Sequence, residues 1–204
     1  MRILNRQISR RTWIILLCVT GLVTAGVVTA FIWESRPIAR IVETLKIAPG
    51  QRIADLGAGD GVFTFPMAEI AGSSGLVYAI EIEQKKLDKI EKKARERNLN
   101  NVRTVLGATD DPRLPEPVDL ILIVNTLHHI SGRAEYLRNL RRYLKPEGRI
   151  AIIDFSRWWP PFHGKMKYSV EQLDGWMQAA EFRRIESHDF LPRNFFIVYG
   201  PTIH

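Results

Sequence analysis

Apolar and polar positions alternate along the chain in blocks that predict strands and helices in turn. Short, almost wholly apolar runs are typical of strands buried on both faces of a parallel sheet, whereas apolar residues three and four positions apart predict amphipathic helices. Strands are expected at 52–56, 76–82, 102–106, 118–124, 149–155, 183–190 and 195–199. Helices are expected at 62–71, 83–98, 133–144 and 169–180, the last opened by a capping box of Ser169 and Gln172. This alternation predicts an α/β fold whose parallel sheet is covered on both faces.

One segment breaks the pattern because it carries no charge over 22 residues, from Thr12 to Trp33. As a helix rising ~1.5 Å per residue it would reach ~33 Å, which is enough to cross a hydrocarbon core. We therefore expect a basic tail at 1–11, a retained single-span transmembrane anchor at 12–33 and one folded domain at 37–204. A cleaved signal peptide, a twin-arginine export signal and a buried core helix are the alternatives.

The formal net charge of +7 is concentrated at the N-terminus. Four basic residues precede the first acidic residue, namely Arg2, Arg6, Arg10 and Arg11. The remaining 25 basic and 22 acidic residues leave +3, so the charge gives no reason to expect nucleic-acid binding. The single cysteine, Cys18, excludes an intrachain disulfide and a zinc site built from several cysteines. No metal ion is expected.

The first candidate ligand-binding residues directly follow the first predicted strand, in the stretch RIADLGAGDGVF (52–63). Its alternating glycines allow a sharp turn and a close approach of the backbone to a ligand, although a tight strand–helix turn would also need glycine. The spacing is G-x-G-x-G, and Val62 occupies the position where a dinucleotide site prefers glycine. Asp60 would repel a pyrophosphate but tolerate a cationic ligand. Glu81, at the end of the second strand, can accept hydrogen bonds from both hydroxyls of a ribose.

With these residues the chain resembles the class I S-adenosylmethionine-dependent methyltransferases. The resemblance rests on IADLGAGDG (53–61), AIEIE (79–83), VDLILIVNTLHHI (118–130) and LKPEGRIAIIDF (144–155), and it covers essentially 37–200. It is strongest to the small-molecule branch that includes the quinone-biosynthesis C-methyltransferases. The resemblance implies S-adenosylmethionine as cofactor and a Rossmann-like, doubly wound, seven-stranded, mostly parallel sheet whose last hairpin contains an antiparallel strand.

The resemblance also implies roles for individual residues around the glycine loop and the fourth strand. The loop residues Gly57, Ala58 and Gly59 would pack against the methionine part of the cofactor. Asp55 would lie near its ammonium group. Asn125, at the end of the fourth strand, would lie beside the methyl donor.

The nucleoside part of the cofactor would be held by the second and third strands. Glu81 would bind the ribose hydroxyls, and Ile82 would lie against the adenine. The family often has an aspartate directly after the glycine that ends the third strand, where it meets the adenine amine. Here Gly107 is followed by three candidate positions, Ala108, Thr109 and Asp110. Either Asp110 or a backbone carbonyl would therefore take that role.

Methyl transfer from a sulfonium is a single in-line displacement with a neutral leaving group. The protein mainly has to align donor and acceptor and to exclude water, and a base is needed only if the acceptor loses a proton. His128 and His129 are candidates for that base or for orienting an acceptor; alternatively one caps the loop and the other packs within it. The aromatic segment 158–163 would hold an apolar acceptor, dip into the membrane interface or form a small satellite core.

These features predict a membrane-anchored methyltransferase acting on a small, lipophilic acceptor. A non-catalytic cofactor-binding scaffold is the alternative, and an NAD-dependent oxidoreductase is disfavoured by Val62 and by the acids beside the loop. The positive-inside rule places the basic tail in the cytoplasm and sends the domain outside. The cytosolic supply of S-adenosylmethionine favours the cytosolic face for the catalytic domain, with export as the alternative. The oligomeric state is not predicted.

Overall fold

The computed structural model describes residues 37–156 and 166–202. The expected basic tail at 1–11, the expected anchor at 12–33 and the aromatic segment 158–163 lie outside these residues. Within the described residues, no helix combines the length and the apolar character needed to cross a membrane. The chain divides into two units, Met1–Ile41 and Val42–His204, and residues 37–41 of the first are helical. The sheet and the site below belong to the second unit.

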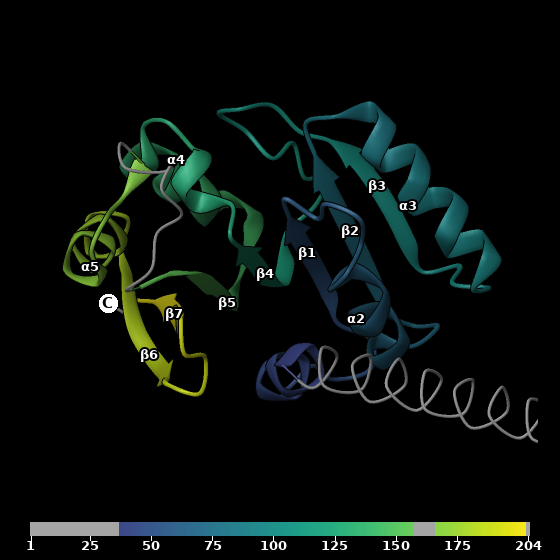
Figure 1. Cartoon of the computed structure of the whole chain (residues 1–204), viewed down its shortest axis with the longest axis horizontal. Helices are drawn as coiled ribbons and strands as arrows, with labels where there is room; N and C mark the ends of the chain where they lie inside the picture. Colours follow the sequence, from purple (N-terminus) through teal and green to yellow (C-terminus); the bar gives the residue numbers. More distant parts are fainter. Residues whose placement is uncertain (1–36, 157–165, 203–204) are drawn as a thin grey trace, which may run out of the picture. The chain divides into compact units, whose positions relative to one another are not determined.

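Seven strands form one sheet in the order β3-β2-β1-β4-β5-β7-β6, with β3 and β6 at its edges (Figure 1). The strands are β1 Arg52–Leu56, β2 Leu76–Glu81, β3 Val102–Leu106, β4 Val118–Val124, β5 Leu144–Phe155, β6 Phe182–His188 and β7 Asn194–Pro201. Neighbouring strands pair in parallel except that β7 runs antiparallel to both β5 and β6. The expected Rossmann-like, seven-stranded, mostly parallel sheet is therefore confirmed.

The helices between the strands are α2 Thr64–Ala71, α3 Gln84–Glu96, α4 Arg133–Leu140 and α5 Val170–Ala179, with short 3-10 turns η1 Leu127–His129 and η2 Arg141–Tyr143. The capping box of Ser169 and Gln172 at the start of α5 is confirmed. The helix predicted at 133–144 is wrong at its C-terminal end, because Leu144 pairs with Val118 and already belongs to β5. An apolar residue at that position suits either the end of a helix or the start of a buried strand, and here pairing with β4 decides.

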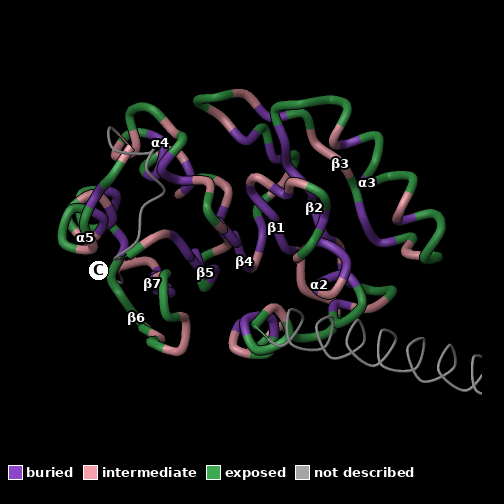
Figure 2. Tube along the Cα trace, in the orientation of Figure 1, coloured by how far each residue is buried: buried purple, intermediate pink, exposed green. Residues whose placement is uncertain are grey.

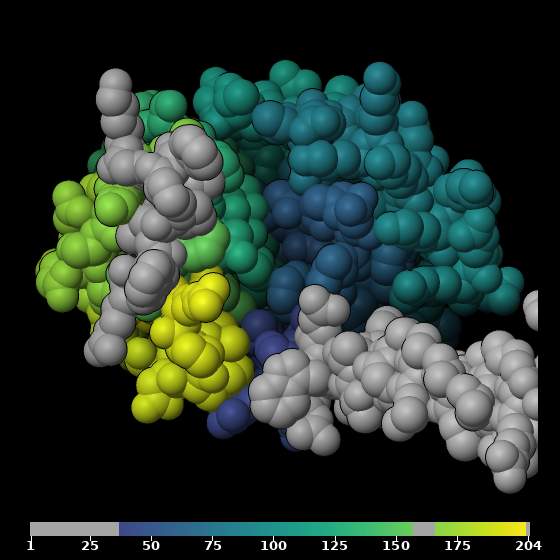
Figure 3. Space-filling view, viewed as in Figure 1, coloured from purple at the N-terminus to yellow at the C-terminus, as the bar shows by residue number. Residues whose placement is uncertain are grey.

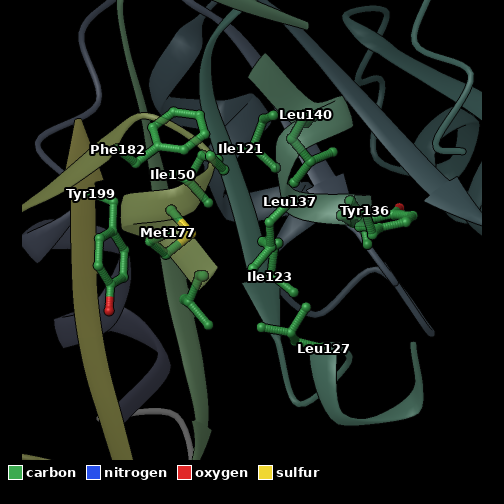
Figure 4. Close-up of a cluster of buried hydrophobic side chains, with 14 of the residues drawn as sticks. Ile121, Ile123, Leu127, Tyr136, Leu137, Leu140, Ile150, Met177, Phe182 and Tyr199 are labelled. Carbon is green, nitrogen blue, oxygen red and sulfur yellow. The ribbon is translucent and has the colours of Figure 1, made fainter. Parts of the chain in front are cut away.

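A large apolar core lies on the face of the sheet that α4 and α5 cover. Figure 4 shows side chains of α4 and α5 meeting those of β4 and β5: Leu137, Leu140, Met177, Ile121, Ile123 and Ile150. Ala54 and Leu56 of β1 belong to the same cluster, so Asp55 between them points to the opposite face. There the hydroxyl of Thr64 in α2 donates a hydrogen bond to Asp55. The two faces of the sheet are thus covered by different helices.

Helix α3 packs on β2 and β3 with one side only. Its buried residues, Leu87, Ile90 and Ala94, repeat at helical spacing, and Figure 2 shows the rest of its length largely exposed. The chain leaves β1 toward β2 on one side and returns to β4 on the other side, so strand order reverses between β1 and β4. Ligands of open α/β sheets bind at the carboxyl ends of the strands at such a reversal.

Candidate active site

A cavity of about 770 Å³ opens at the carboxyl ends of the strands, where the strand order reverses. Figure 3 shows the surface hollowed between the blue residues of the glycine loop and the teal and green residues that follow β3 and β4. The cavity is lined by Leu56, Gly57, Gly59, Ile80, Glu81, Ile82, Glu83, Lys86, Gly107, Ala108, Thr109, Asp110, Val124, Asn125, Thr126, His129, Ile130, Ser131 and Tyr136. Its size lies within the range of ~300–1,000 Å³ that small-molecule sites occupy.

The loop between β1 and α2 needs glycine at Gly57 for steric reasons. Gly57 has a φ of 78°, and a Cβ atom there would lie 2.2 Å from the Thr126 hydroxyl oxygen. Its N–H donates to the carbonyl of Ile80 at 2.9 Å. The backbone of the loop can therefore approach the end of β4 only without a side chain at this position.

Gly59 occupies a different environment. It also has a left-handed φ, 56°, but a Cβ atom at Gly59 would meet no protein atom within 4 Å, and the residue lines the cavity. Its N–H donates to Glu81 Oε1 at 2.8 Å. The space beside Gly59 is a cradle that a side chain would fill, which fits a ligand lying against the loop backbone.

Glu81 is fixed at the cavity wall by backbone and side-chain contacts. The carboxylate is only 8% exposed; Oε1 accepts from Gly59, and Oε2 accepts from the N–H of Ile82 at 3.2 Å. Lys86 Nζ lies 3.7 Å from Oε1 and 2.8 Å from Glu83 Oε1. Each carboxylate oxygen has two lone pairs, so Glu81 retains acceptor capacity for a further ligand. Ile82 beside it is 57% exposed, which leaves an apolar surface on the cavity wall.

Asp55 lies behind the loop rather than in the cavity wall. It is 2% exposed, and its Oδ2 accepts the Thr64 hydroxyl at 2.5 Å. Burial raises the pKa of Asp55 to about 6; hydrogen bonds from Thr64 oppose this rise, and the negative charge of Glu81 adds to it. Ala58 is likewise buried and donates its N–H to Ile80. The structure therefore places Asp55 and Ala58 in the support of the loop.

The turn after β3 contributes the three predicted residues Ala108, Thr109 and Asp110 to the cavity wall. The neighbouring acid, Asp111, is engaged elsewhere: it accepts from the Arg142 guanidinium at 2.6 Å and the Tyr143 hydroxyl at 2.8 Å. These partners and the N–H of Arg113 hold the pKa of Asp111 below its usual value, against the effect of its partial burial. Of these two adjacent acids, Asp110 is the one that faces the cavity.

Asn125 closes the end of β4 with an unusual backbone conformation. Its φ is 47°, a left-handed value that asparagine tolerates better than most other residues. Its N–H donates to the carbonyl of Ile153 at 2.8 Å, and its exposed side chain lines the cavity. The carboxamide oxygen accepts from Asn194 Nδ2 at 2.9 Å. Asn125 is therefore positioned by the adjacent strand β5 and by Asn194 of β7, the strand beyond it.

The two adjacent histidines have different environments. His129 is exposed and lines the cavity, whereas His128 is 2% exposed and lies outside the lining. His128 Nδ1 lies 2.8 Å from Asp154 Oδ1, and the His128 N–H donates to Asp154 Oδ2 at 3.2 Å. The two imidazole rings are 4.1 Å apart between centroids. His129 is thus the histidine placed for contact with a ligand.

Sequence reasoning missed the buried carboxylate that holds His128. Asp154 is fully buried in β5, and besides His128 it accepts from the N–H of Phe155 at 2.9 Å and the hydroxyl of Tyr168 at 2.8 Å. Burial and the charge of Asp154 raise the pKa of Tyr168. An acid inside the apolar run RIAIIDF was the available signal, because a buried charge requires partners. Among the described residues, no three His, Cys, Asp or Glu side chains are grouped as a metal site would require.

Comparison with known proteins agrees with this geometry. Residues 47–189 match a family model described as a methyltransferase domain. The ubiquinone/menaquinone biosynthesis C-methyltransferase of Cupriavidus metallidurans is 29% identical over 134 residues, which cover 64% of this chain and 52% of the relative. The chain thus spans about half the length of the curated relatives it matches.

Solved structures show the same fold. A SAM-dependent methyltransferase from Aquifex aeolicus superposes with a TM-score of 0.71 at 23% identity, covering 81% of this chain and 89% of that one. The 1,6-didemethyltoxoflavin-N1-methyltransferase of Burkholderia thailandensis, solved with S-adenosylhomocysteine, gives 0.64 at 18% identity, covering 98% and 94%. Together with the family match, these likenesses show that the chain belongs to the class I S-adenosylmethionine-dependent methyltransferases.

Proposed function

We propose that this protein transfers the methyl group of S-adenosylmethionine to a small, lipophilic acceptor of the hydroquinone class. The observation that carries the proposal is the open space beside Gly59, whose N–H donates to the buried carboxylate of Glu81 at 2.8 Å, at the strand-order reversal. The names of the quinone-biosynthesis relatives support the acceptor class.

The residues present fit the cofactor along one continuous wall. Gly57 and Gly59 would hold the methionine part, and Glu81 would accept hydrogen bonds from the ribose hydroxyls. The exposed side chain of Ile82 would lie against the adenine, and Asp110 would accept from its amine. Ala108 and Thr109 would shape the wall at the purine. Asp55 would act through the loop that it supports, because it does not itself reach the cavity.

Asn125 and His129 both line the cavity, and in this proposal the acceptor meets the cofactor beside them. When bound, S-adenosylmethionine supplies the methyl group of its sulfonium. Loss of that methyl group leaves a neutral thioether. His129 would accept the proton that the hydroquinone loses when the bond to the methyl carbon forms. That proton comes from the hydroxyl group if oxygen is methylated, or from the ring carbon if carbon is methylated. Asn125 would orient the acceptor, and His128 would hold the ring of His129 in place through their 4.1 Å contact. Apolar lining residues such as Ile130 and Val124 would exclude water from the reacting groups.

The proposal includes membrane attachment through residues 12–33, with the catalytic domain on the cytosolic face. Its support is the uncharged segment of 22 residues and the cytosolic supply of the cofactor. A lipophilic acceptor would then be delivered from the bilayer. Protease accessibility of the domain in intact cells tests this placement. Protection from external protease supports the cytosolic face, and cleavage in intact cells contradicts it.

The activity is tested with the full chain in detergent, using methyl-tritiated S-adenosylmethionine and naphthohydroquinone, a bicyclic hydroquinone with unsubstituted ring carbons. We expect radiolabel to pass into the solvent-extractable product and to depend on His129. Protein that binds the cofactor but never labels naphthohydroquinone or longer-chain hydroquinones would contradict the acceptor class. The matched control is His188→Gln, because His188 lies on β6 outside the cavity lining.

A further inference from the structure

Asn194 touches the candidate site from a strand that sequence reasoning did not connect with it. It is the first residue of β7, and in the sheet register it faces Phe155, the last residue of β5. The carbonyl of Arg193, next to it, accepts the N–H of Ser156 at 2.9 Å, which fixes this corner of the sheet. From there the side chain of Asn194 reaches past the end of β5 to Asn125 at the end of β4.

We propose that Asn194 is a positioning residue that orients the Asn125 carboxamide, so that its NH2 end faces the methyl acceptor. This inference rests on the proposed function, in which Asn125 lies beside the methyl donor. It adds a residue from β7 that controls which end of the carboxamide the acceptor meets. Asn194 itself does not line the cavity.

A carboxamide has an accepting oxygen at one end and two N–H donors at the other. Asn194 Nδ2 donates to Asn125 Oδ1 at 2.9 Å, so this contact turns the oxygen of the carboxamide toward β7. The NH2 group of Asn125 is then the end of the carboxamide that is turned away from β7 and offered to a ligand in the cavity. The backbone of Asn125 is held separately by the 2.8 Å hydrogen bond to Ile153, so rotation of the amide is the remaining freedom that Asn194 removes.

The polarity matters because it selects the acceptor. A wall that offers N–H donors matches a substrate oxygen, such as that of a hydroquinone or phenolate, and disfavours an ammonium group. The ligand also meets a donor already in place, so less rotational freedom is lost on binding. Asn194 therefore contributes to specificity for an oxygen-bearing acceptor without touching it.

Two substitutions distinguish the orientation of the Asn125 carboxamide from the mere presence of a partner at position 194. Asn194→Asp places an acceptor opposite Asn125, so the carboxamide must turn its N–H groups to β7 and its oxygen to the cavity. Asn194→Ala removes the partner and leaves the carboxamide free to rotate. The matched control is Asn100→Asp, which makes the same charge change at an exposed residue outside the cavity lining.

The first measurement uses the ligand-free full chain in detergent and nitrogen-15 spectra of side-chain amides. The Asn194 signal is identified by its loss in Asn194→Asp. In Asn125→Asp a carboxylate accepts from Asn194 in place of an amide oxygen, so we expect one Asn194 amide proton to move downfield. Identical Asn194 signals in Asn125→Asp and the wild-type protein would overturn the proposed contact, whatever the protein's activity.

The second measurement uses S-adenosylmethionine labelled with carbon-13 in its methyl group as the probe. We expect the bound methyl resonance to move in Asn194→Asp, to move less in Asn194→Ala and to stay in place in Asn100→Asp, while the Kd stays within about threefold of the wild-type value in all three. With naphthohydroquinone we expect Asn194→Asp to lower kcat about tenfold, as the loss of one hydrogen bond would. A methyl resonance and kcat unchanged in Asn194→Asp would overturn the inference.

The two proposals fail in different ways. If the wild-type protein does not bind S-adenosylmethionine, the proposed function fails while the ligand-free amide spectra still test the Asn194 contact. If binding occurs but Asn194→Asp leaves both the methyl resonance and kcat unchanged, the positioning role alone fails. Should Asn194→Asp not fold, Asn194→Ala supplies the same comparison with a smaller expected shift.

Discussion

Gly59 and Gly72 provide a matched pair for testing the cradle at the scale of single residues. Both have left-handed φ angles, 56° and 67°, and a Cβ atom at either would meet no protein atom within 4 Å, but only Gly59 lines the cavity. At Gly72, where ψ is −176°, the backbone lies in a region almost restricted to glycine, so an alanine there should cost about 1–3 kcal/mol of unfolding free energy. We expect Gly59→Ala to weaken S-adenosylmethionine binding at least about tenfold and Gly72→Ala to leave it unchanged.

Calorimetric titration and urea unfolding of the two variants measure these effects. Because Gly72→Ala introduces backbone strain away from the cavity, a loss of cofactor affinity in Gly59→Ala alone reports that the cofactor fills the space beside Gly59. Equal affinities in Gly59→Ala and Gly72→Ala would show that the ligand does not lie against this part of the loop.

The buried carboxyl of Asp55 makes the stability of the protein depend on pH. Burial raises its pKa to about 6 in the folded protein, compared with about 3.9 for an unfolded aspartate. Between these values the folded protein holds a proton that the unfolded chain has lost, so the free energy of unfolding falls as the pH rises from about 4 to about 6. The penalty is complete above about pH 6 and amounts to about 3 kcal/mol for two pKa units.

Asp55→Asn isolates this effect from other titrating groups. We expect the stability of the variant relative to the wild-type protein to rise by about 2 kcal/mol between pH 4 and pH 7, measured by urea unfolding. The other carboxyls titrate in both proteins and cancel in the difference. A difference that does not change with pH would contradict the assignment of the raised pKa to Asp55.

At the scale of single elements, helix α5 depends on its N-terminal capping box. Ser169 Oγ accepts from the N–H of Gln172 at 3.2 Å, and Gln172 Oε1 accepts from the N–H of Ser169 at 2.9 Å. We expect Ser169→Ala to lower the free energy of unfolding by about 1 kcal/mol, whereas the exposed substitution Gln178→Ala should change it little. Urea unfolding checks this, and equal stability of the two variants would contradict a stabilising role for the box.

The strands β1, β2 and β4 were predictable from the sequence because strands buried on both faces of a parallel sheet need nearly continuous apolar runs. The end of α4 was not, since Leu144 fits either a helix or a strand until its partner Val118 is known. The cavity residues Gly57, Gly59 and Glu81 were predictable because they lie in short segments that directly follow strands. Asp154 and Asn194 were missed because their partners lie far away in the sequence, and only the folded sheet brings them together.

In the whole molecule, the excess positive charge and the cavity lie in different parts of the chain. The arginines at the N-terminus precede an uncharged segment of membrane-spanning length, and the near-neutral remainder forms the family's domain. The cavity is built from the ends of β1, β2 and β4 and from the turn after β3. In the proposed function, this one cavity holds both the methyl donor and the acceptor. A lipophilic acceptor would need little travel if the domain works beside a bilayer.

The most direct test of the account is calorimetric titration of the full chain in detergent with S-adenosylmethionine, alongside Glu81→Gln. We expect saturable binding at one site in the wild-type protein and affinity at least about tenfold lower in Glu81→Gln, because a neutral amide is a weaker partner for the ribose hydroxyls. Folded wild-type protein that shows no binding at millimolar S-adenosylmethionine, or a Glu81→Gln variant that binds as tightly as the wild type, would contradict it.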